Sequence, residues 1–160
     1  MKEIFTLVIV TISLLGFAEE RPRYPTEKVS RVLSFLESVK SHSATVHPRR
    51  LDGVSYQNGE HVTFWTESVQ RDIEFIRKSV NAYRGRPLVS RTVELFLHIK
   101  DLEASLHHLS DALSELGHGS AADGAKIKQW LTENLTLQKE LTSQRRDLEQ
   151  SLGEILRAIR

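Results

Sequence analysis

A heptad repeat between residues 95 and 116 limits what this chain can form more than any other feature. Its seven apolar positions alternate steps of four and three, at Leu95, Ile99, Leu102, Leu106, Leu109, Leu113 and Leu116. A half-buried strand would need an apolar residue at every second position, so this spacing predicts a long helix with a narrow, coiled-coil-like seam. Gly117 follows the last leucine and predicts the end of that helix.

Three further segments repeat apolar residues at helical spacing, from about residue 26 to 42, from about 60 to 83 and from about 120 or 123 to residue 160. Because no segment alternates convincingly with period two, the sequence predicts an all-α fold. This is either a four-helix bundle or a long antiparallel helical hairpin with two shorter helices. In the last helix, Asn134 and either Gln144 or Arg145 interrupt the apolar line. Such interruptions usually set register or partner choice.

The last two predicted helices carry opposite charge. Residues 92–119 hold five acidic residues and one lysine, a net charge of −4, whereas residues 125–160 hold seven basic and five acidic residues, a net charge of +2. Exposed ion pairs contribute only about 0.2–1 kcal/mol each, so charge favours the pairing of these two helices while leucine burial stabilises it. We therefore expect the coiled-coil-like seam to lie between them.

The stretch from about residue 43 to 59 loses the helical period. It carries Pro48, Asp52-Gly53 and Asn58-Gly59, which are typical of turns. Loops of this length are often functional. The sequence thus predicts that residues 19–160 form a single helical domain with one long loop.

The first eighteen residues have the order of a secretory signal. Lys2 precedes an apolar stretch from Ile4 to Leu15, and the small residues Gly16 and Ala18 mark a cleavage site after Ala18. That stretch is shorter than the ~20 residues of a membrane-spanning helix, and its retention as an anchor is the alternative. We interpret residues 1–18 as a signal peptide. The mature protein is then extracytoplasmic, periplasmic or secreted, without a stable membrane span.

Composition excludes several classes of function. The chain has no cysteine, which removes disulfides, thiolate catalysis, iron–sulfur clusters and the usual structural zinc sites. The net charge of +1 gives no reason to expect nucleic acid as a partner. The sequence has no Gly-x-Ser-x-Gly serine elbow, no Ser-x-x-Lys pair and no phosphate-binding loop. We therefore expect no enzyme and no cofactor.

The seven histidines leave one route to metal binding. Glu103, His107 and Asp111 follow one another at intervals of four and so share one helix face, where they could offer nitrogen and oxygen ligands to a transition metal. The same spacing is typical of exposed pairs that support a helix, which is the interpretation we favour. A bundle that binds a metal or small ligand through these residues is the alternative function.

Aromatic and basic residues gather around the helix junctions. Tyr, Trp and Arg dominate the energetics of protein interfaces. We expect an interaction edge made of six residues, Arg49, Arg50, Tyr56, Trp65, Arg84 and Arg86. The alternative is that the arginines are solvated turn residues and that Trp65 belongs to the core.

By elimination, the sequence favours a non-enzymatic exported protein that acts through protein–protein contacts, as an oligomer, adaptor or chaperone-like binder. A two-in-seven seam is narrower than the face a bundle helix normally buries, which predicts a homodimer. In size, export and helicity the chain resembles small periplasmic helical stress proteins. Their Leu-Thr-x-x-Gln motif is not met, because residues 135–138 and 141–144 each fall one residue short, so no family is assigned.

Overall fold

The computed structural model describes residues 25–51, 53–82, 88–119 and 123–159. The expected signal peptide, residues 1–18, lies outside these ranges. The described elements are α2 (Thr26–Ser43), the short 3-10 helix η1 (Pro48–Arg50), α3 (Tyr56–Ala82), α4 (Leu88–Gly119) and α5 (Gly124–Ile159). These residues contain no strand, and no helix among them has both the length and the apolar character needed to cross a bilayer.

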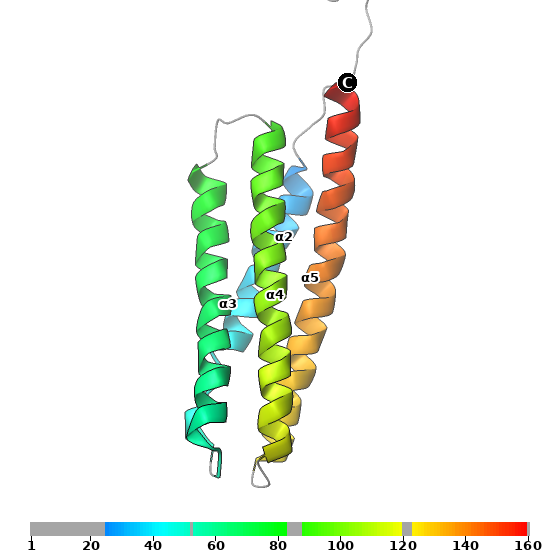
Figure 1. Ribbon diagram of the computed structural model, residues 1–160. Helices are drawn as coiled ribbons and strands as arrows, with labels where there is room; N and C mark the ends of the chain where they lie inside the picture. Colours follow the sequence, from blue (N-terminus) through cyan, green and yellow to red (C-terminus); the bar gives the residue numbers. More distant parts are fainter. Residues whose placement is uncertain (1–24, 52, 83–87, 120–122, 160) are drawn as a thin grey trace, which may run out of the picture.

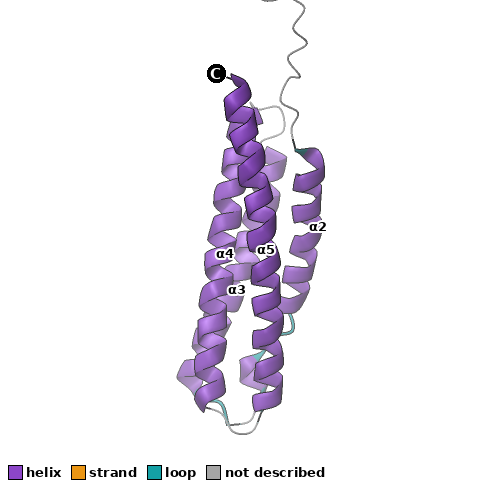
Figure 2. Cartoon of the chain, turned by 90° about the vertical axis from the view of Figure 1, so that its right-hand side faces the viewer, coloured by secondary structure: helices purple, strands orange, loops and turns teal. Residues whose placement is uncertain are grey.

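The four α-helices form a bundle in which each runs antiparallel to the next, so the all-α prediction and its bundle form are confirmed (Figure 1). Helix α4 packs on α3 and on α5, and α2 closes the ring by packing on the other sides of these two helices. The contact between α4 and α5 is the most extensive, as their opposite charges predicted. In Figure 2 α5 lies in front, with the shorter α2 at its side.

The heptad seam of α4 is buried within one chain. Its seven residues are at most 2% exposed. The reason given for a homodimer is therefore wrong, because α4 buries a wider face than the leucine stripe. Thr92, Ser105 and Ser110 are also buried on this helix. Ser105 Oγ donates to Asp72 Oδ2 of α3 (2.6 Å) and Ser110 Oγ to the Leu106 carbonyl (3.2 Å), so these hydroxyls enter the core with their hydrogen bonds made.

Two predicted helix ends differ from those observed. Helix α3 begins at Tyr56, so Asn58-Gly59 lies in its first turn and the connection from α2 is shorter than predicted. Ser55 Oγ accepts a hydrogen bond from the Asn58 backbone N–H (3.3 Å), as an N-terminal cap does. Gly59 is buried, and a Cβ there would lie 3.4 Å from Val54 Cγ1. The loop therefore lies in ordinary van der Waals range of the first turn of α3.

Gly117 likewise lies inside α4, which continues to Gly119. A Cβ at Gly117 would lie 3.4 Å from Ile127 Cγ2 of α5. That distance is an ordinary van der Waals contact, so the end of α4 packs directly against the first turns of α5 at this position.

Polar residues occupy the α4–α5 seam as the sequence predicted. Asn134 is completely buried, and its Nδ2 donates to the Leu106 carbonyl (2.7 Å) and to Ser110 Oγ (2.8 Å). Of the two candidates for the second interruption, Gln144 is buried in the seam, whereas Arg145 lies beside it. These bonds give α4 and α5 one preferred register.

Candidate interaction surface and a buried histidine

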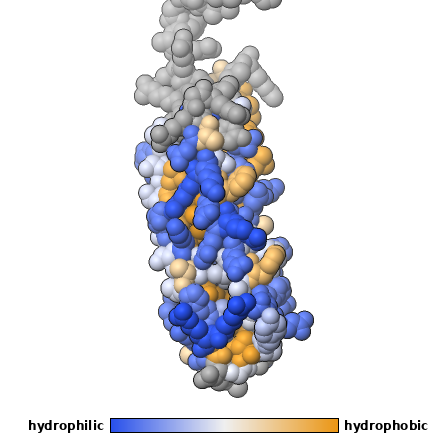
Figure 3. Space-filling view, turned by 90° about the vertical axis from the view of Figure 1, so that its left-hand side faces the viewer, coloured by the Kyte–Doolittle hydropathy of each residue, from blue (hydrophilic) through white to orange (hydrophobic). Residues whose placement is uncertain are grey.

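Two phenylalanines lie exposed on the outer face of α3. Phe64 is 52% and Phe75 58% exposed. They are eleven residues apart, which is close to three full helical turns, so they share one side of α3 at a separation of about 16 Å. Between them the Arg71 guanidinium lies 5.9 Å from the centre of the Phe64 ring. Figure 3 faces this side of the bundle and shows hydrophobic residues surfacing among hydrophilic ones.

Trp65 connects this line to α4. Its indole stacks on the His108 ring (centroids 4.3 Å apart, 23° between planes), and Phe64 meets it edge-on at 5.0 Å. Trp65 Nε1 donates to His61 Nε2 (3.1 Å). Since Nε2 accepts this bond, the proton of neutral His61 lies on Nδ1, which is 3.4 Å from a Glu115 oxygen. These contacts fix the indole in one orientation.

Phe75 makes a similar contact with α4 at the other end of the line. Its ring meets that of His98 edge-on, with centroids 4.8 Å apart. Glu94 and Asp101 lie 3.7 and 4.0 Å from the two nitrogens of His98. We call the surface formed by these residues of α3 and α4 the aromatic face; it comprises Phe64, Trp65, Arg71, Phe75, His98 and His108.

The interaction edge predicted from the sequence is only partly assembled. Arg49, Arg50 and Tyr56 lie at the end of the bundle where α3 begins. Tyr56 is 81% exposed, and Arg49 Nε donates to Glu60 Oε1 (2.8 Å). Trp65 is half-buried more than two turns further along, against α4. A hollow of about 310 Å³ lies between the η1 loop and α3.

Two members of the predicted edge, Arg84 and Arg86, lie outside the described residues. Sequence reasoning placed Phe64 beside the predicted long loop without including it in the edge, and it did not single out Phe75. The helical spacing indicates that Phe64 and Phe75 lie at the surface, because neither belongs to the stripe of buried residues on α3. That stripe is formed by Val62, Val69, Ile73 and Ile76.

The metal candidates have other partners. Glu103 accepts hydrogen bonds from Arg145 Nε (2.6 Å) and from the Thr142 hydroxyl, both on α5. His107 Nε2 lies 3.8 Å from an Asp111 oxygen on its own helix. Within the described ranges, no three His, Asp or Glu side chains form a group that could hold a metal ion. His107 and Asp111 thus form a pair within one helix, whereas Glu103 pairs with α5.

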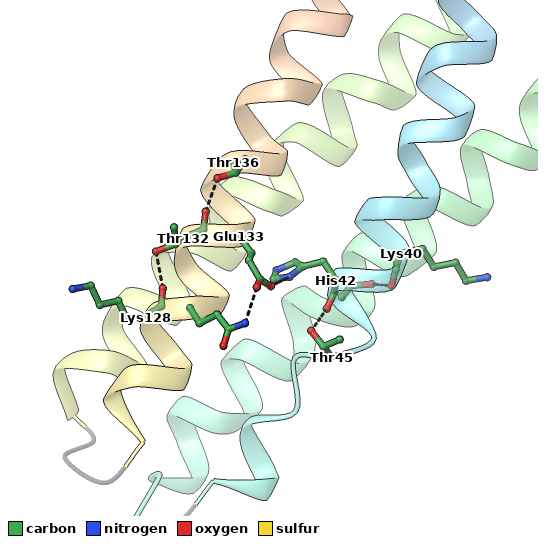
Figure 4. A network of polar contacts seen from close by, with 9 residues as sticks. Lys40, His42, Thr45, Lys128, Thr132, Glu133 and Thr136 are labelled. Atoms are coloured by element: carbon green, nitrogen blue, oxygen red, sulfur yellow. Dashed lines mark hydrogen bonds and ion pairs between the residues drawn. The ribbon is translucent and has the colours of Figure 1, made fainter.

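A buried histidine that the sequence did not reveal joins α2 to α5. His42 lies in the last turn of α2 and is 7% exposed, and its Nδ1 is 3.1 Å from Glu133 Oε2 (Figure 4). The second carboxylate oxygen accepts from Gln129 Nε2 (2.8 Å). Because a carboxylate only accepts, the proton of neutral His42 lies on Nδ1, while Nε2 is buried without a partner among the described residues.

Both members of this pair have shifted pKa values. Burial lowers the pKa of His42, outweighing the hydrogen bond and the charge of Glu133, which raise it. The hydrogen bond from Gln129 lowers the pKa of Glu133, and the contact with His42 adds to this effect. Protonation of His42 would also place an N–H at Nε2 with no acceptor among the described residues, so the neutral ring suits the site.

We expect acid to weaken the fold through this pair. The folded pKa of His42 is below its ordinary value of 6.5, so the unfolded chain binds more protons once the pH falls to that range. The contribution of His42 to the free energy of unfolding is then fully present above about pH 6.5 and is lost as the pH falls through the folded pKa. Glu133, whose folded pKa is also lowered, adds a second loss below about 4.5.

Urea unfolding followed by circular dichroism at pH 7.5, 6.5 and 5.5 measures this dependence. His42→Gln should flatten it over this range, whereas His107→Gln, at an exposed position, should leave it as in the wild type. An equal slope in wild type and His42→Gln would show that His42 does not couple stability to protons.

Comparison of the chain with models of known protein families, with curated proteins and with solved structures gave no match.

Proposed function

We propose that this chain is an exported, non-enzymatic helical protein that acts by binding another protein through the aromatic face. The observation that carries the proposal is the pair Phe64 and Phe75, two large apolar side chains more than half exposed on one line of α3. Exposed aromatic residues with a neighbouring arginine are the composition of interface centres. Keeping such side chains in water is unfavourable unless a partner covers them.

The setting of Trp65 adds to this support. Its stacking on His108 and its hydrogen bond to His61 hold the indole in place before any partner arrives. A side chain that is already ordered loses little rotamer freedom on binding, so more of the contact energy remains as affinity. The aromatic face therefore combines a fixed centre with two phenylalanine anchors.

The polar pairs inside the bundle support a structural role for the groups that could otherwise suggest chemistry. Ser105 bonds to Asp72 between α4 and α3, Glu103 to Arg145 between α4 and α5, and His42 to Glu133 between α2 and α5. Burial raises the pKa of Asp72, and its hydrogen bond from Ser105 opposes that shift. Each pair joins two helices, which is a structural role and fits a protein that serves as a rigid binding scaffold.

Site-specific photo-crosslinking in an exporting host tests the proposal. A photoreactive phenylalanine analogue is placed at position 75, or at position 135 of α5, where Leu135 is 48% exposed and serves as a matched control. We expect a discrete crosslinked partner from position 75 and none from position 135. The purified partner should bind at least tenfold more weakly to Phe75→Ser, because removing a side chain that anchors an interface costs about 2 kcal/mol or more of binding free energy.

Two results would contradict the proposal. One is equal crosslinking from positions 75 and 135. The other is a partner whose affinity is the same for the wild type, Phe64→Ser and Phe75→Ser.

A further inference from the structure

The outer stripe of α3 has a charge order that reverses about its middle. Phe64, Glu67, Arg71 and Phe75 follow at steps of three and four and are all exposed, so they form one line along the helix. Within the described parts of the chain, neither Glu67 nor Arg71 has an ion-pair partner. Reading from Phe64, the line is therefore aromatic, acidic, basic and aromatic.

This order is self-complementary in one orientation only. When two identical helices pair antiparallel about a two-fold axis, residues whose numbers add to nearly the same value lie opposite each other. An axis between residues 69 and 70 places Phe64 against Phe75 of the other copy, and Glu67 within one residue, a rise of about 1.5 Å, of the position opposite its Arg71. A parallel pair would instead oppose Glu67 to Glu67 and Arg71 to Arg71, which is unfavourable.

The remaining charges of the stripe are satisfied within the chain. Glu74 lies 4.0 Å from Lys78 one turn further along α3, and Glu60 bonds to Arg49 of the η1 loop. Glu67 and Arg71 are thus the charges available at the centre of the stripe. In a pair of chains, Glu67 of each copy would contact Arg71 of the other at the centre, and Phe64 of each copy would contact Phe75 of the other on either side.

From this complementarity we infer that the protein bound at the aromatic face is a second copy of this chain, paired through antiparallel α3 helices. This inference rests on the proposed function, because it names the partner of the same surface. The contact leaves the four-helix core untouched and differs from an association through the α4 seam, which is buried inside each copy.

Sedimentation equilibrium with charge reversals tests the pairing. The wild type should be a dimer at roughly micromolar concentration, in the range of modest interfaces. Glu67→Arg and Arg71→Glu should each weaken self-association about tenfold or more, because every dimer then contains two repulsive contacts. An equimolar mixture of the two variants should form a heterodimer of wild-type affinity, since the introduced arginine faces the introduced glutamate and the native Arg71 faces the native Glu67.

Leu135→Ser, which removes an exposed leucine of α5, should associate as the wild type does. Circular dichroism of each variant shows that the helices remain folded. A wild-type chain that stays monomeric up to ~100-fold above that concentration would overturn the inference, as would a mixture that associates no better than its components. If position 75 then still crosslinks to a different protein, the proposed function stands and only the identity of the partner is wrong.

Discussion

Replacing Asn134 with aspartate should destabilise the fold by about 3–5 kcal/mol at neutral pH, the cost of leaving a buried charge uncompensated. The two side chains have nearly the same shape, so packing changes little. Asn134 Nδ2 donates to the Leu106 carbonyl at 2.7 Å, and aspartate would place a charged acceptor oxygen there. Two acceptors would then face each other in a site with no solvent access.

Urea unfolding at pH 7.5 gives the loss directly, with Asn81→Asp on the exposed surface of α3 as the matched control. The control should change stability by less than about 1 kcal/mol, as surface substitutions usually do. At pH 5.5 the difference between Asn134→Asp and the wild type should shrink, because the buried carboxyl takes up a proton and can donate again. Equal losses for the two variants would mean that Asn134 is not held in the core.

Leu106→Ala should lower the free energy of unfolding by about 2–5 kcal/mol, the range for a fully buried leucine whose site cannot collapse. Leu106 has no solvent exposure and lies in the middle of the α4 seam, and its own carbonyl accepts the bond from Asn134. Truncation would therefore open a cavity at the place where α4 and α5 are joined by both apolar and polar contacts. We expect the variant to remain helical with a lower unfolding midpoint.

Leu97→Ala on the same helix is the matched control, because Leu97 is 46% exposed. Its loss should be below about 1 kcal/mol, since much of the side chain already contacts water. Thermal and urea unfolding of both variants decide the comparison. If the two substitutions lower the free energy of unfolding equally, the α4 seam does not pack as tightly as its burial indicates.

The helices and the pairing of α4 with α5 could be predicted because they depend on the spacing of apolar residues and on charge, which the sequence states directly. The sequence could not predict that the core is closed within one chain. Ser105 and Ser110 count as polar in any pattern, yet they are buried because their hydroxyls bond to Asp72 and to the Leu106 carbonyl. Those partners are set by tertiary structure and by side-chain rotamers.

The candidate surface was predictable in part for similar reasons. Tyr56 and Arg49 were expected at the surface and lie there. Phe75 was missed because it lies far along the chain from the loop around which the edge was sought, although the helical spacing already leaves it off the buried stripe. His42 was missed because its partner Glu133 is 91 residues away, and no local pattern relates the two.

The central claim is that a single chain buries its own core and leaves the outer face of α3 available to a partner. Urea unfolding of the doubly substituted chain Phe64→Ser/Phe75→Ser, followed by helicity over a hundredfold range of protein concentration, tests it most directly. We expect wild-type helix content and one cooperative transition with a midpoint independent of concentration, because a monomer that buries its own seam needs no second copy to fold. A midpoint that rises with protein concentration, or a loss of helix content on dilution, would contradict the claim by showing that the α4 seam is completed between chains.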